Sequence, residues 1–297
     1  MIVNATNLRM MFVGFSTLFQ QARLGVEPTW SRVAMRVPST TRTQEYGWLG
    51  EMPRVREWLG ERVIQGLNTH GYAIRNRTFE LTLGVDREDM EDDNLGVFSP
   101  VITEMGRAAA SFPDELVWPL LPAGAVTPCY DGQYFFDTDH PVLDVNGQTY
   151  SVSNWQGGNG TPWFLIDDTR AMKPLIFQDR EPFKFVAMDQ PTDEVVFNQK
   201  RFRYGVDARC NAGFGLWQIA FGSRQELTAE TYAAARVAMT SMKGDFARPL
   251  GLKPSLLVVP STLEPQARTI LKADRNAAGA TNIWAGSAEM FMSPWLA

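Results

Sequence analysis

Apolar residues near the start of the chain recur at helical spacing. Over residues 7–24 they fall on one stripe with a period of 3.6 residues, and Gly25 and Pro28 end the pattern. The stripe consists of Leu8, Met11, Phe12, Phe15, Leu18, Phe19 and Ala22. A helix this apolar on one face needs a surface to lie against. Two interpretations stay open: packing on the chain's own core, and docking on a neighbouring subunit.

Residues 36–80 have a different pattern, in which apolar and polar positions alternate in short stretches. The segment holds seven arginines and five glutamates. It predicts a long two-stranded excursion that carries one short helix over residues 53–59 and is too polar to build a core. Because an isolated hairpin is only marginally stable in water, we expect the excursion to lie on another surface.

The excursion is followed by an acidic run, residues 86–93, with six acids and one arginine. One interpretation is a solvated turn before a helix N-terminus, where acids suit the helix dipole. A calcium loop is a poor match, since the central glycine and distal glutamate of an EF-hand are absent. A third interpretation is that the run receives the arginine-rich excursion of an adjacent copy, because opposite charges on one chain permit head-to-tail association.

The middle of the chain changes from a helical pattern to a series of short apolar runs. Residues 99–121 predict one long helix with a kink at Pro113. The runs that follow predict successive strands. They are residues 163–166, 175–177, 183–186, 195–197, 202–206 and 216–221.

The last part of the chain alternates between helix and strand patterns. Thr228 is a cap for a helix that extends to about Met242, and residues 256–259 form an apolar strand. A second helix begins at Ser261, and residues 289–292 predict a final strand. This alternation indicates a compact α/β lobe.

Composition narrows the class of protein. The length of 297 residues predicts about two domains, and 44% hydrophobic residues are enough to build their cores. The 9 Trp and 18 Phe are large side chains of the kind favoured at interfaces. The net charge of −5 argues against a nucleic-acid-binding surface. Two cysteines, Cys129 and Cys210, form no disulfide framework and indicate a reducing compartment. We expect no secretory signal and no membrane span, since no apolar run reaches about 18 residues.

The richest chemistry lies in residues 126–142, which crowd Cys129, Asp131, Asp137, Asp139 and His140 together. A metal-dependent enzyme that uses Asp137, Asp139 and His140 is one alternative, although the chain has only one further histidine to complete a site. A nucleophilic pair of Cys129 and His140 lacks an identifiable orienting acid and oxyanion donor. The simpler interpretation is structural: Asp131 begins a turn, Asp137 and Asp139 bond nearby backbone, and His140 is a satisfied polar residue. We therefore expect no catalytic residue, cofactor or metal.

Two further segments offer weaker signals. The loop 157–160 is rich in glycine but lacks the lysine and the strand–loop–helix setting of a phosphate-binding loop. Arg201, Arg203 and Arg209 lie on one predicted strand with aromatic residues between them. Stacking on single-stranded nucleic acid is conceivable there, but a strand face that forms salt bridges is the commoner case.

Many short blocks spread over the whole chain carry a resemblance. They are Tyr46–Glu51, Glu57–Gly60, His70–Tyr72, Glu91–Gly96, Glu104–Arg107, Pro113–Leu116, Pro128–Gln133, Phe135–Asp137, Lys173–Gln178, Phe202–Gly205, Gly251–Pro254, Gln266–Arg268 and Pro294–Leu296. In order and spacing these blocks resemble the Mu-like phage major head subunits, a family called gpT.

This resemblance implies the α+β, Hong Kong ninety-seven-type capsid fold. The fold consists of an N-terminal arm, an extended loop, a peripheral domain on a long spine helix, and an axial domain. On this chain we expect the arm at residues 1–35 and the extended loop at 36–80. The peripheral domain is expected at 81–125 and 172–202, and the axial domain at 126–171 and 203–297.

The resemblance also implies a function. It is that of a major capsid protein that self-assembles, as hexamers and pentamers, into the icosahedral head of a Mu-like tailed phage and encloses double-stranded DNA without sequence-specific binding. The implied partners are a portal, a separate scaffold protein and a decoration protein of the same phage, with no membrane. Assembly is expected in the cytoplasm of the bacterial host, and the mature location is the virion. An encapsulin-like compartment with an enzyme cargo is the alternative within this fold.

From the residues we predict two contacts between copies, because repeated weak contacts become collectively strong. In the first, the arginine-bearing loop lies over the acidic run of a neighbour. In the second, the aromatic stripe of the first helix lies on a neighbour. The residues expected at these contacts are Arg54, Arg56, Trp58, Arg62, Glu88, Asp89, Glu91, Asp92, Asp93, Phe12, Phe15 and Phe19.

Overall fold

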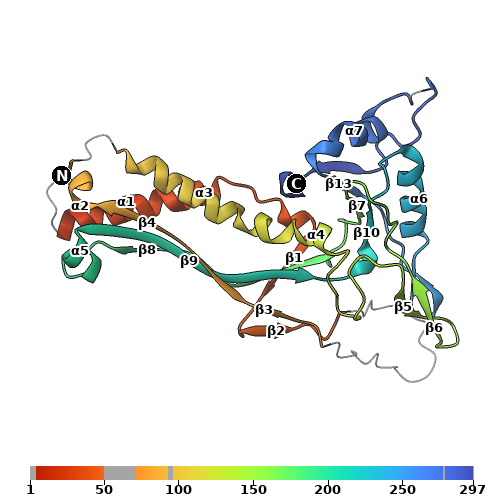
Figure 1. Ribbon diagram of the computed structural model, residues 1–297, viewed down its shortest axis with the longest axis horizontal. Helices are drawn as coiled ribbons and strands as arrows, with labels where there is room; N and C mark the ends of the chain where they lie inside the picture. The colour runs from red at the N-terminus through yellow and green to blue at the C-terminus, as the bar shows by residue number, and fades with distance from the viewer. Residues whose placement is uncertain (1–4, 50–70, 93–95, 277, 297) are drawn as a thin grey trace.

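Two long strands run through the body of the molecule, which a computed structural model describes for residues 5–49, 71–92, 96–276 and 278–296 (Figure 1). The strands β8 (Leu175–Met188) and β9 (Arg201–Phe214) are antiparallel neighbours. The shorter strand β1 (Ala34–Pro38) pairs parallel with β8, and β4 (Arg77–Asp86) pairs antiparallel with β9. The result is a four-stranded sheet in the order β1-β8-β9-β4. This sheet and the helices packed on it are called the body.

The alternation of side chains gives this sheet one covered and one open face. On β9, Phe202, Tyr204 and Val206 are buried on one side, whereas Arg201 and Arg203 are exposed on the other. This is the pattern expected where only one face of an antiparallel sheet is packed. The sequence predicted the strands at 175–177 and 183–186 separately, but the structure joins them in β8 with shifts of register between Asp179 and Lys184.

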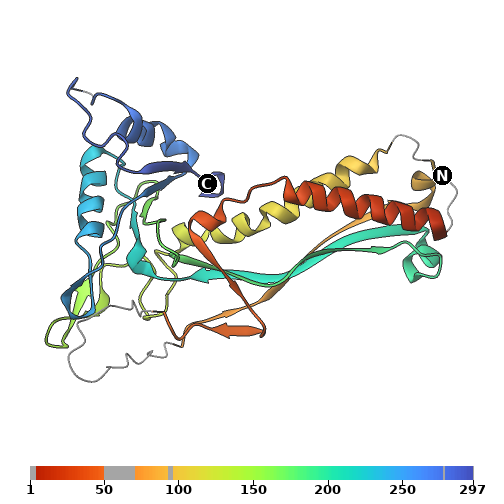
Figure 2. The ribbon, with the colours of Figure 1, turned by 180° about the vertical axis from the view of Figure 1, so that it is seen from behind.

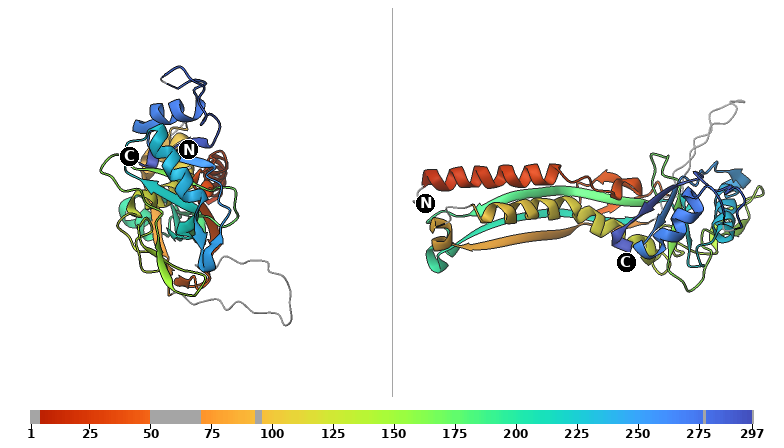
Figure 3. Two further views of the ribbon diagram at one scale, coloured as in Figure 1. Left: turned by 90° about the vertical axis from the view of Figure 1, so that its right-hand side faces the viewer. Right: turned by 90° about the horizontal axis from the view of Figure 1, so that it is seen from above.

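Two helices of 20 residues each cover the packed face. Helix α1 (Ala5–Leu24) and helix α3 (Phe98–Val117) lie side by side along the sheet, as the view from above in Figure 3 shows. At Gly106 of α3 an added Cβ would meet the carbonyl oxygen of Phe19 at 2.5 Å, so only glycine allows the two backbones to approach this closely. Helix α3 confirms the predicted long helix, and Pro113 lies within it. A short helix α4 (Leu120–Ala123) follows.

The tip of the body, far from the lobe, is built by two short helices. Helix α2 (Arg87–Asp92) follows β4, and α5 (Glu194–Gln199) connects β8 to β9 (Figure 1). The two are joined by a hydrogen bond of 2.8 Å from the backbone N–H of Arg87 to the carbonyl oxygen of Lys200. The prediction of a strand at 195–197 is wrong: Val195 and Val196 are buried on one side of α5, which ends at Lys200 in the left-handed conformation with φ 53°.

The excursion begins as a two-stranded ladder of β2 (Thr43–Glu45) and β3 (Ala73–Arg75), in agreement with the prediction. Buried polar side chains tie its base to the sheet, since Gln178 of β8 accepts a hydrogen bond of 2.7 Å from Tyr46 and donates one of 2.7 Å to Asn76. The predicted helix at 53–59 lies outside the described residues.

The lobe is built on a second, smaller sheet in the order β10-β7-β13-β14. Its strands are β7 (Trp163–Ile166), β10 (Ala220–Ser223), β13 (Leu256–Val259) and β14 (Glu289–Met292). Every residue of β7, β10 and β13 is buried, which explains why these strands appear in the sequence as continuous apolar runs. Helix α6 (Ala229–Thr240) packs near β10, and α7 (Glu264–Lys272) packs on β13 and β14 (Figure 2).

Thr228 caps α6 as predicted, because its hydroxyl and that of Thr231 each accept a hydrogen bond from the other residue's backbone. Smaller elements complete the lobe and its connections. They are β5 (His140–Leu143), β6 (Thr149–Val152), β11 (Lys243–Gly244), β12 (Arg248–Pro249), and the 3-10 turns η1 (Trp30–Arg32), η2 (Trp217–Ile219), η3 (Asp245–Ala247), η4 (Ser261–Leu263) and η5 (Pro294–Leu296).

Some of the expected segment boundaries fall inside strands of the body sheet. The expected division between residues 202 and 203 falls inside β9, whose whole length 201–214 belongs to the body sheet. The expected extended loop, 36–80, likewise includes parts of β1 and β4, which belong to the same sheet. The physical reason is that both ends of the excursion are anchored as strands before it leaves the body. No helix among the described residues has the length and apolar character required to cross a lipid bilayer.

Candidate functional sites: a buried polar cluster and the exposed surfaces

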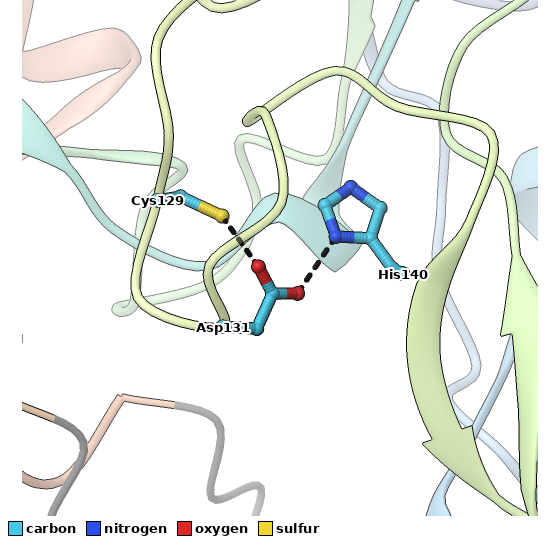
Figure 4. Close-up of side chains that lie close together, drawn as sticks. All are labelled: Cys129, Asp131 and His140. Carbon is cyan, nitrogen blue, oxygen red and sulfur yellow. Dashed lines mark hydrogen bonds and ion pairs between the residues drawn. The ribbon is translucent and has the colours of Figure 1, made fainter.

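The crowded segment at 126–142 folds so that three of its side chains meet in the lobe. The carboxylate of Asp131 accepts a hydrogen bond of 3.1 Å from the Cys129 thiol and lies 2.7 Å from Nδ1 of His140 (Figure 4). Asp131 also accepts the backbone N–H of Gln133, so it closes a turn as predicted. The His140 side chain is fully buried.

Residues outside this segment hold the imidazole of His140 in place. Its ring stacks on Trp217 with 3.8 Å between ring centroids, and Nε2 lies 3.2 Å from Oδ1 of Asn154. The amide of Asn154 is oriented by its own bonds, because Oδ1 accepts from the backbone of Asp137 and Nδ2 donates to the carbonyl of Phe135. Nδ1 of His140 thus faces the carboxylate of Asp131, and Nε2 faces the amide oxygen of Asn154.

The electrostatics of the cluster oppose nucleophilic chemistry. Burial raises the pKa of the Cys129 thiol well above its usual value, and the charge of Asp131 raises it further, so the thiol stays protonated. Burial would raise the pKa of Asp131, but the hydrogen bonds from His140 and Cys129 outweigh it and hold this pKa below its usual range. Asp131 separates Cys129 from His140, so the histidine has no access to the thiol proton.

The structure does not assemble the three proposed metal ligands. Asp137 accepts backbone hydrogen bonds from Tyr134 and Thr138, as the structural interpretation predicted, and Asp139 is exposed. Cys129, Asp131 and His140 are the potential ligands that do meet, with donor atoms within 4.8 Å of one another. Their contacts are those of a satisfied hydrogen-bond network, which joins a turn to the core of the lobe.

The acidic run is partly neutralised within the chain. Asp86 forms a 2.6 Å ion pair with Arg201, and Glu88 lies 3.2 Å from Lys200 of the tip. Arg87 forms a 2.8 Å ion pair with Glu91 along α2. Asp89 and Asp92 are exposed, one helical turn apart, and have no ion-pair partner among the described residues, whereas Asp93 lies outside them.

The aromatic stripe of α1 is divided between the core and the surface. Phe19 is fully buried and Phe15 nearly so, because they pack on Phe185 and Tyr204 of the chain's own sheet. Of the three predicted contact residues, Phe12 alone is half-buried. For Phe15 and Phe19 the structure thus favours the interpretation of packing on the chain's own core. The exposed large apolar side chains of α1 are instead Met10, Val13 and Leu24, at 61%, 56% and 82% exposure.

The predicted loop contacts Arg54, Arg56, Trp58 and Arg62 lie outside the described residues. At the base of the same excursion the structure forms a basic cleft of about 830 Å³, which the sequence analysis missed. Its lining residues are Arg42, Arg75, Asn76, Arg77, Thr78, Arg209 and Asn211. The signal in the sequence was the pair Arg75 and Arg77, but their meeting with Arg209 depends on the pairing of β4 with β9.

The predicted basic strand forms salt bridges, as expected. Arg201 pairs with Asp86, and Arg209 lies 3.2 Å from Glu181. Arg203 donates to the side chain of Gln199. These arginines therefore stabilise the outer face of the sheet.

Exposed apolar side chains lie at the tip of the body. Phe197 of α5 is 80% exposed, and Val186 and Met188 at the end of β8 are 51% and 44% exposed. Large apolar side chains gathered on a surface mark contact sites more often than isolated ones do.

The junction between body and lobe is held by charged side chains. Arg32 lies 2.7 Å from both Asp168, which follows β7, and Glu289 at the start of β14. Asp114 of α3 accepts hydrogen bonds from the backbone of Thr29 and Trp30. Arg32 therefore joins the body to the lobe, and Asp114 holds the segment before β1 on α3.

Comparison with known sequences gives one consistent result. A family model described as the Mu-like prophage major head subunit gpT matches residues 8–296. The major capsid protein of Escherichia phage Mu is 41% identical over 289 residues, which cover 95% of each chain. The Mu-like prophage FluMu major head subunit of Haemophilus influenzae is 40% identical over 91% of this chain and 90% of the relative.

Solved structures agree. A chain from the procapsid of bacteriophage JBD30 is 44% identical, and the match covers 99% of this chain and 100% of that chain with a TM-score of 0.89. A chain from the JBD30 capsid matches over the full length of both chains with 34% identity and a TM-score of 0.78. A third, from a JBD30 capsid decorated with minor capsid protein trimers, has a TM-score of 0.77 over 93% of this chain and 94% of that chain.

Proposed function

Because this chain belongs to the family of Mu-like prophage major head subunits, gpT, and is thus a phage major capsid protein of the Hong Kong ninety-seven-type fold, we propose how its surfaces build the head. Copies gather as hexamers and pentamers into a closed icosahedral shell around double-stranded DNA. The chain is a structural protein of the virion and not an enzyme. The full-length match to the JBD30 procapsid chain, at a TM-score of 0.89, is the observation that carries the proposal.

The two parts of the molecule receive different roles in this proposal. The body, with α3 as its spine, is the peripheral domain, and its tip meets the tips of neighbouring copies. The lobe is the axial domain and gathers around the five- and six-fold axes. Residues 1–35 form the arm, and the excursion between β1 and β4 is the extended loop. The course of β9 supports a boundary after residue 214 in place of the expected one after 202.

The contacts between copies form the second part of the proposal. The loop residues Arg54, Arg56, Trp58 and Arg62 lie over the acidic side chains Glu88, Asp89, Glu91, Asp92 and Asp93 of a neighbour, and Phe12 contributes to the contact made by α1. Exposed ion pairs are individually weak, at about 0.2–1 kcal/mol, but a closed shell repeats each of them many times.

The partners of the shell belong to the same phage. We propose a portal, a separate scaffold protein and a decoration protein, and assembly in the cytoplasm of the bacterial host. One of the similar JBD30 structures is a capsid decorated with minor capsid protein trimers, which supports the last kind of partner.

Electron microscopy of the expressed chain tests the proposal. The chain is produced alone and together with the phage's scaffold protein, and the particles are imaged and their contents analysed. Closed shells of uniform size are expected in at least one of the two preparations. A soluble monomer in both preparations would contradict the proposal. Shells that enclose an enzyme in place of DNA during infection would favour the encapsulin-like alternative.

The loop contact has its own test. Charge reversal at Arg54, Arg56 and Arg62 is expected to lower the yield of shells and their resistance to salt and heat. Shells that form and withstand both as before would show that these arginines do not face the acidic run.

A further inference from the structure

We infer that the basic cleft at the base of the excursion binds the acidic helix α2 of a second copy of this chain. The inference rests on the proposed shell and names one contact within it. It extends the loop contact proposed above to the same acidic helix of the neighbour, with further arginines that lie on the sheet and at its edge and not in the outer part of the excursion.

The cleft has an excess of positive charge that the chain itself does not balance. Four arginines and no acid line it. Arg209 pairs with Glu181, whereas Arg42, Arg75 and Arg77 have no ion-pair partner among the described residues. All three are exposed, so their charges are available to a partner.

The geometry of the cleft suits carboxylates. Arg75 ends β3 and Arg77 begins β4, and Asn76 between them is turned inward to bond Ser39 and Thr41. The buried side chain of Asn76 thus anchors the backbone between the two arginines. Guanidinium groups bind carboxylates through two parallel hydrogen bonds. An anchored backbone reduces the conformational entropy that is lost when each of these bonds forms.

The matching acids lie at the opposite end of β4. Asp86 ends the strand that Arg77 begins, and α2 follows it with Asp89 and Asp92 exposed and without ion-pair partners among the described residues. Ten residues of β-strand span about 30 Å, at about 3.3 Å per residue. A cleft and a helix at opposite ends of one strand cannot meet within a chain. They can meet between chains, and a contact between unlike surfaces leads to rings when its rotation closes.

Nucleic acid is the less suitable occupant. The chain carries a net charge of −5, and a surface that binds the DNA backbone neutralises several phosphates in a row. The cleft offers about four cations in one place. In a shell, by contrast, each copy supplies one cleft and one α2 helix, so every cleft has a helix to bind.

The first experiment is a charge swap in shells assembled from the full chain with its scaffold. Arg75→Glu with Arg77→Glu, and separately Asp89→Arg with Asp92→Arg, are each expected to lower the yield of shells by about tenfold because the lost contact is repeated at every subunit. Combining the four substitutions restores opposite charges and is expected to restore most of the yield. Lys243→Glu with Arg275→Glu makes the same change of charge on exposed residues of the lobe, outside the cleft and α2, and is expected to lower the yield less than either reversal.

The second experiment measures proximity directly. In shells that carry Arg75→Cys with Asp89→Cys, mild oxidation is expected to link separate copies into a ladder of disulfide-bonded oligomers. The native Cys129 and Cys210 are buried at 6% and 3% exposure and serve as the background in the wild type. A link within one chain is ruled out by the length of β4.

The outcomes separate the inference from the function on which it rests. If the wild type forms no shells under any condition, the proposed function fails. If it forms shells but the charge reversals leave the yield unchanged, or the paired cysteines stay unlinked, the inference alone is overturned. Normal shells that retain less DNA after Arg75→Glu with Arg77→Glu would also overturn it, in favour of nucleic acid as the occupant.

Discussion

The body and the lobe bury their apolar residues in different ways. In the lobe, the strands β7, β10 and β13 are buried along their whole length, so the sheet is covered on both faces by the chain itself. In the body, α1 and α3 cover one face of the sheet, and the other face carries exposed residues along β4, β8 and β9. The core of the lobe is thus covered by the chain itself, whereas one face of the body sheet stays uncovered.

The two parts are therefore expected to contribute differently to the stability of free and of assembled subunits. A buried core contributes the same free energy before and after assembly, while a half-covered sheet gains when neighbours bind to the folded state. We therefore expect substitutions in the buried core of the lobe to act equally on free and assembled subunits. Substitutions on the uncovered face of the body sheet should act differently in the two states.

The largest expected effect follows from a cavity in the lobe. Phe164→Ala removes a fully buried ring that stacks on Phe136 with centroids 5.2 Å apart, and should lower the free energy of unfolding by about 3–5 kcal/mol. Urea unfolding of free subunits, followed by tryptophan fluorescence, measures the loss. Phe19→Ala, at an equally buried site of the body, is the comparison. Both rings are buried within the chain, so assembly should compensate neither loss. A loss at Phe164 that shrinks in assembled shells would contradict the role of the lobe core.

A smaller loss is expected where α1 touches α3. Gly106→Ala places a methyl group 2.5 Å from the carbonyl oxygen of Phe19 and 2.8 Å from Cβ of Ala22, so α1 must shift, at a cost of about 1–3 kcal/mol. The thermal unfolding temperature of free subunits is the measurement. Gly14→Ala is the matched control, because a Cβ there has no neighbour within 4 Å and alanine favours the helix. Equal behaviour of the two variants would show that α1 does not rest on α3 in solution.

The buried cluster predicts a pH-dependent effect confined to the lobe. Burial raises the pKa of Asp131, but its hydrogen bonds with His140 and Cys129 lower it by more, so the folded pKa lies below the unfolded value of about 4. A depressed pKa contributes stability above the unfolded value, and this stability is lost as the pH falls through the folded value. Asp131→Asn should cost about 1–2 kcal/mol at pH 7, and the difference from the wild type should shrink below about pH 4.

Unfolding midpoints of the two proteins between pH 3 and pH 7 check this expectation. The exposed Asp274→Asn serves as the control and should follow the wild type throughout. A cost of Asp131→Asn that stays constant down to pH 3 would mean that the carboxylate is not what stabilises the turn.

The smallest effect on the free subunit is expected at the tip. Phe197→Ser replaces a side chain that is 80% exposed, so its free energy of unfolding should change by no more than about 0.5 kcal/mol. Shells should nevertheless become less stable to heat if neighbours cover the tip. Shells of unchanged heat stability would show that these exposed side chains at the tip make no contact. The contrast between body and lobe would then rest on the charged contacts alone.

Local signals in the sequence predicted much of this fold. Continuous apolar runs marked the lobe strands β7 and β13, and the cap at Thr228 marked the start of α6. The run Val195–Phe197 misled, because two β-branched residues followed by an aromatic are typical of a strand, whereas the left-handed Lys200 ends a helix there. The polar residues 178–181 divide β8 into two apolar runs in the sequence, but the strand continues through them with shifts of register between Asp179 and Lys184.

The sites depended on pairings that no local pattern contains. The crowding of Cys129, Asp131 and His140 was visible, but the orienting Asn154 and the stacked Trp217 come from distant segments. The acidic run was visible too, while its neutralisation by Arg201 depends on the antiparallel register of β4 and β9. Residues far apart in sequence meet through sheet topology, and a single sequence does not state that topology.

The shift of register in β8 has a mechanical consequence. Two antiparallel strands of 14 residues act as a stiff beam from the tip to the lobe, and the ladder between them is irregular from Asp179 to Lys184. A beam bends where its cross-links are fewest, so a force on the tip is expected to turn the outer half of the body about this point while the rest keeps its shape. A curved wall of such beams can flatten or tighten by many small rotations, with no subunit unfolding on the way.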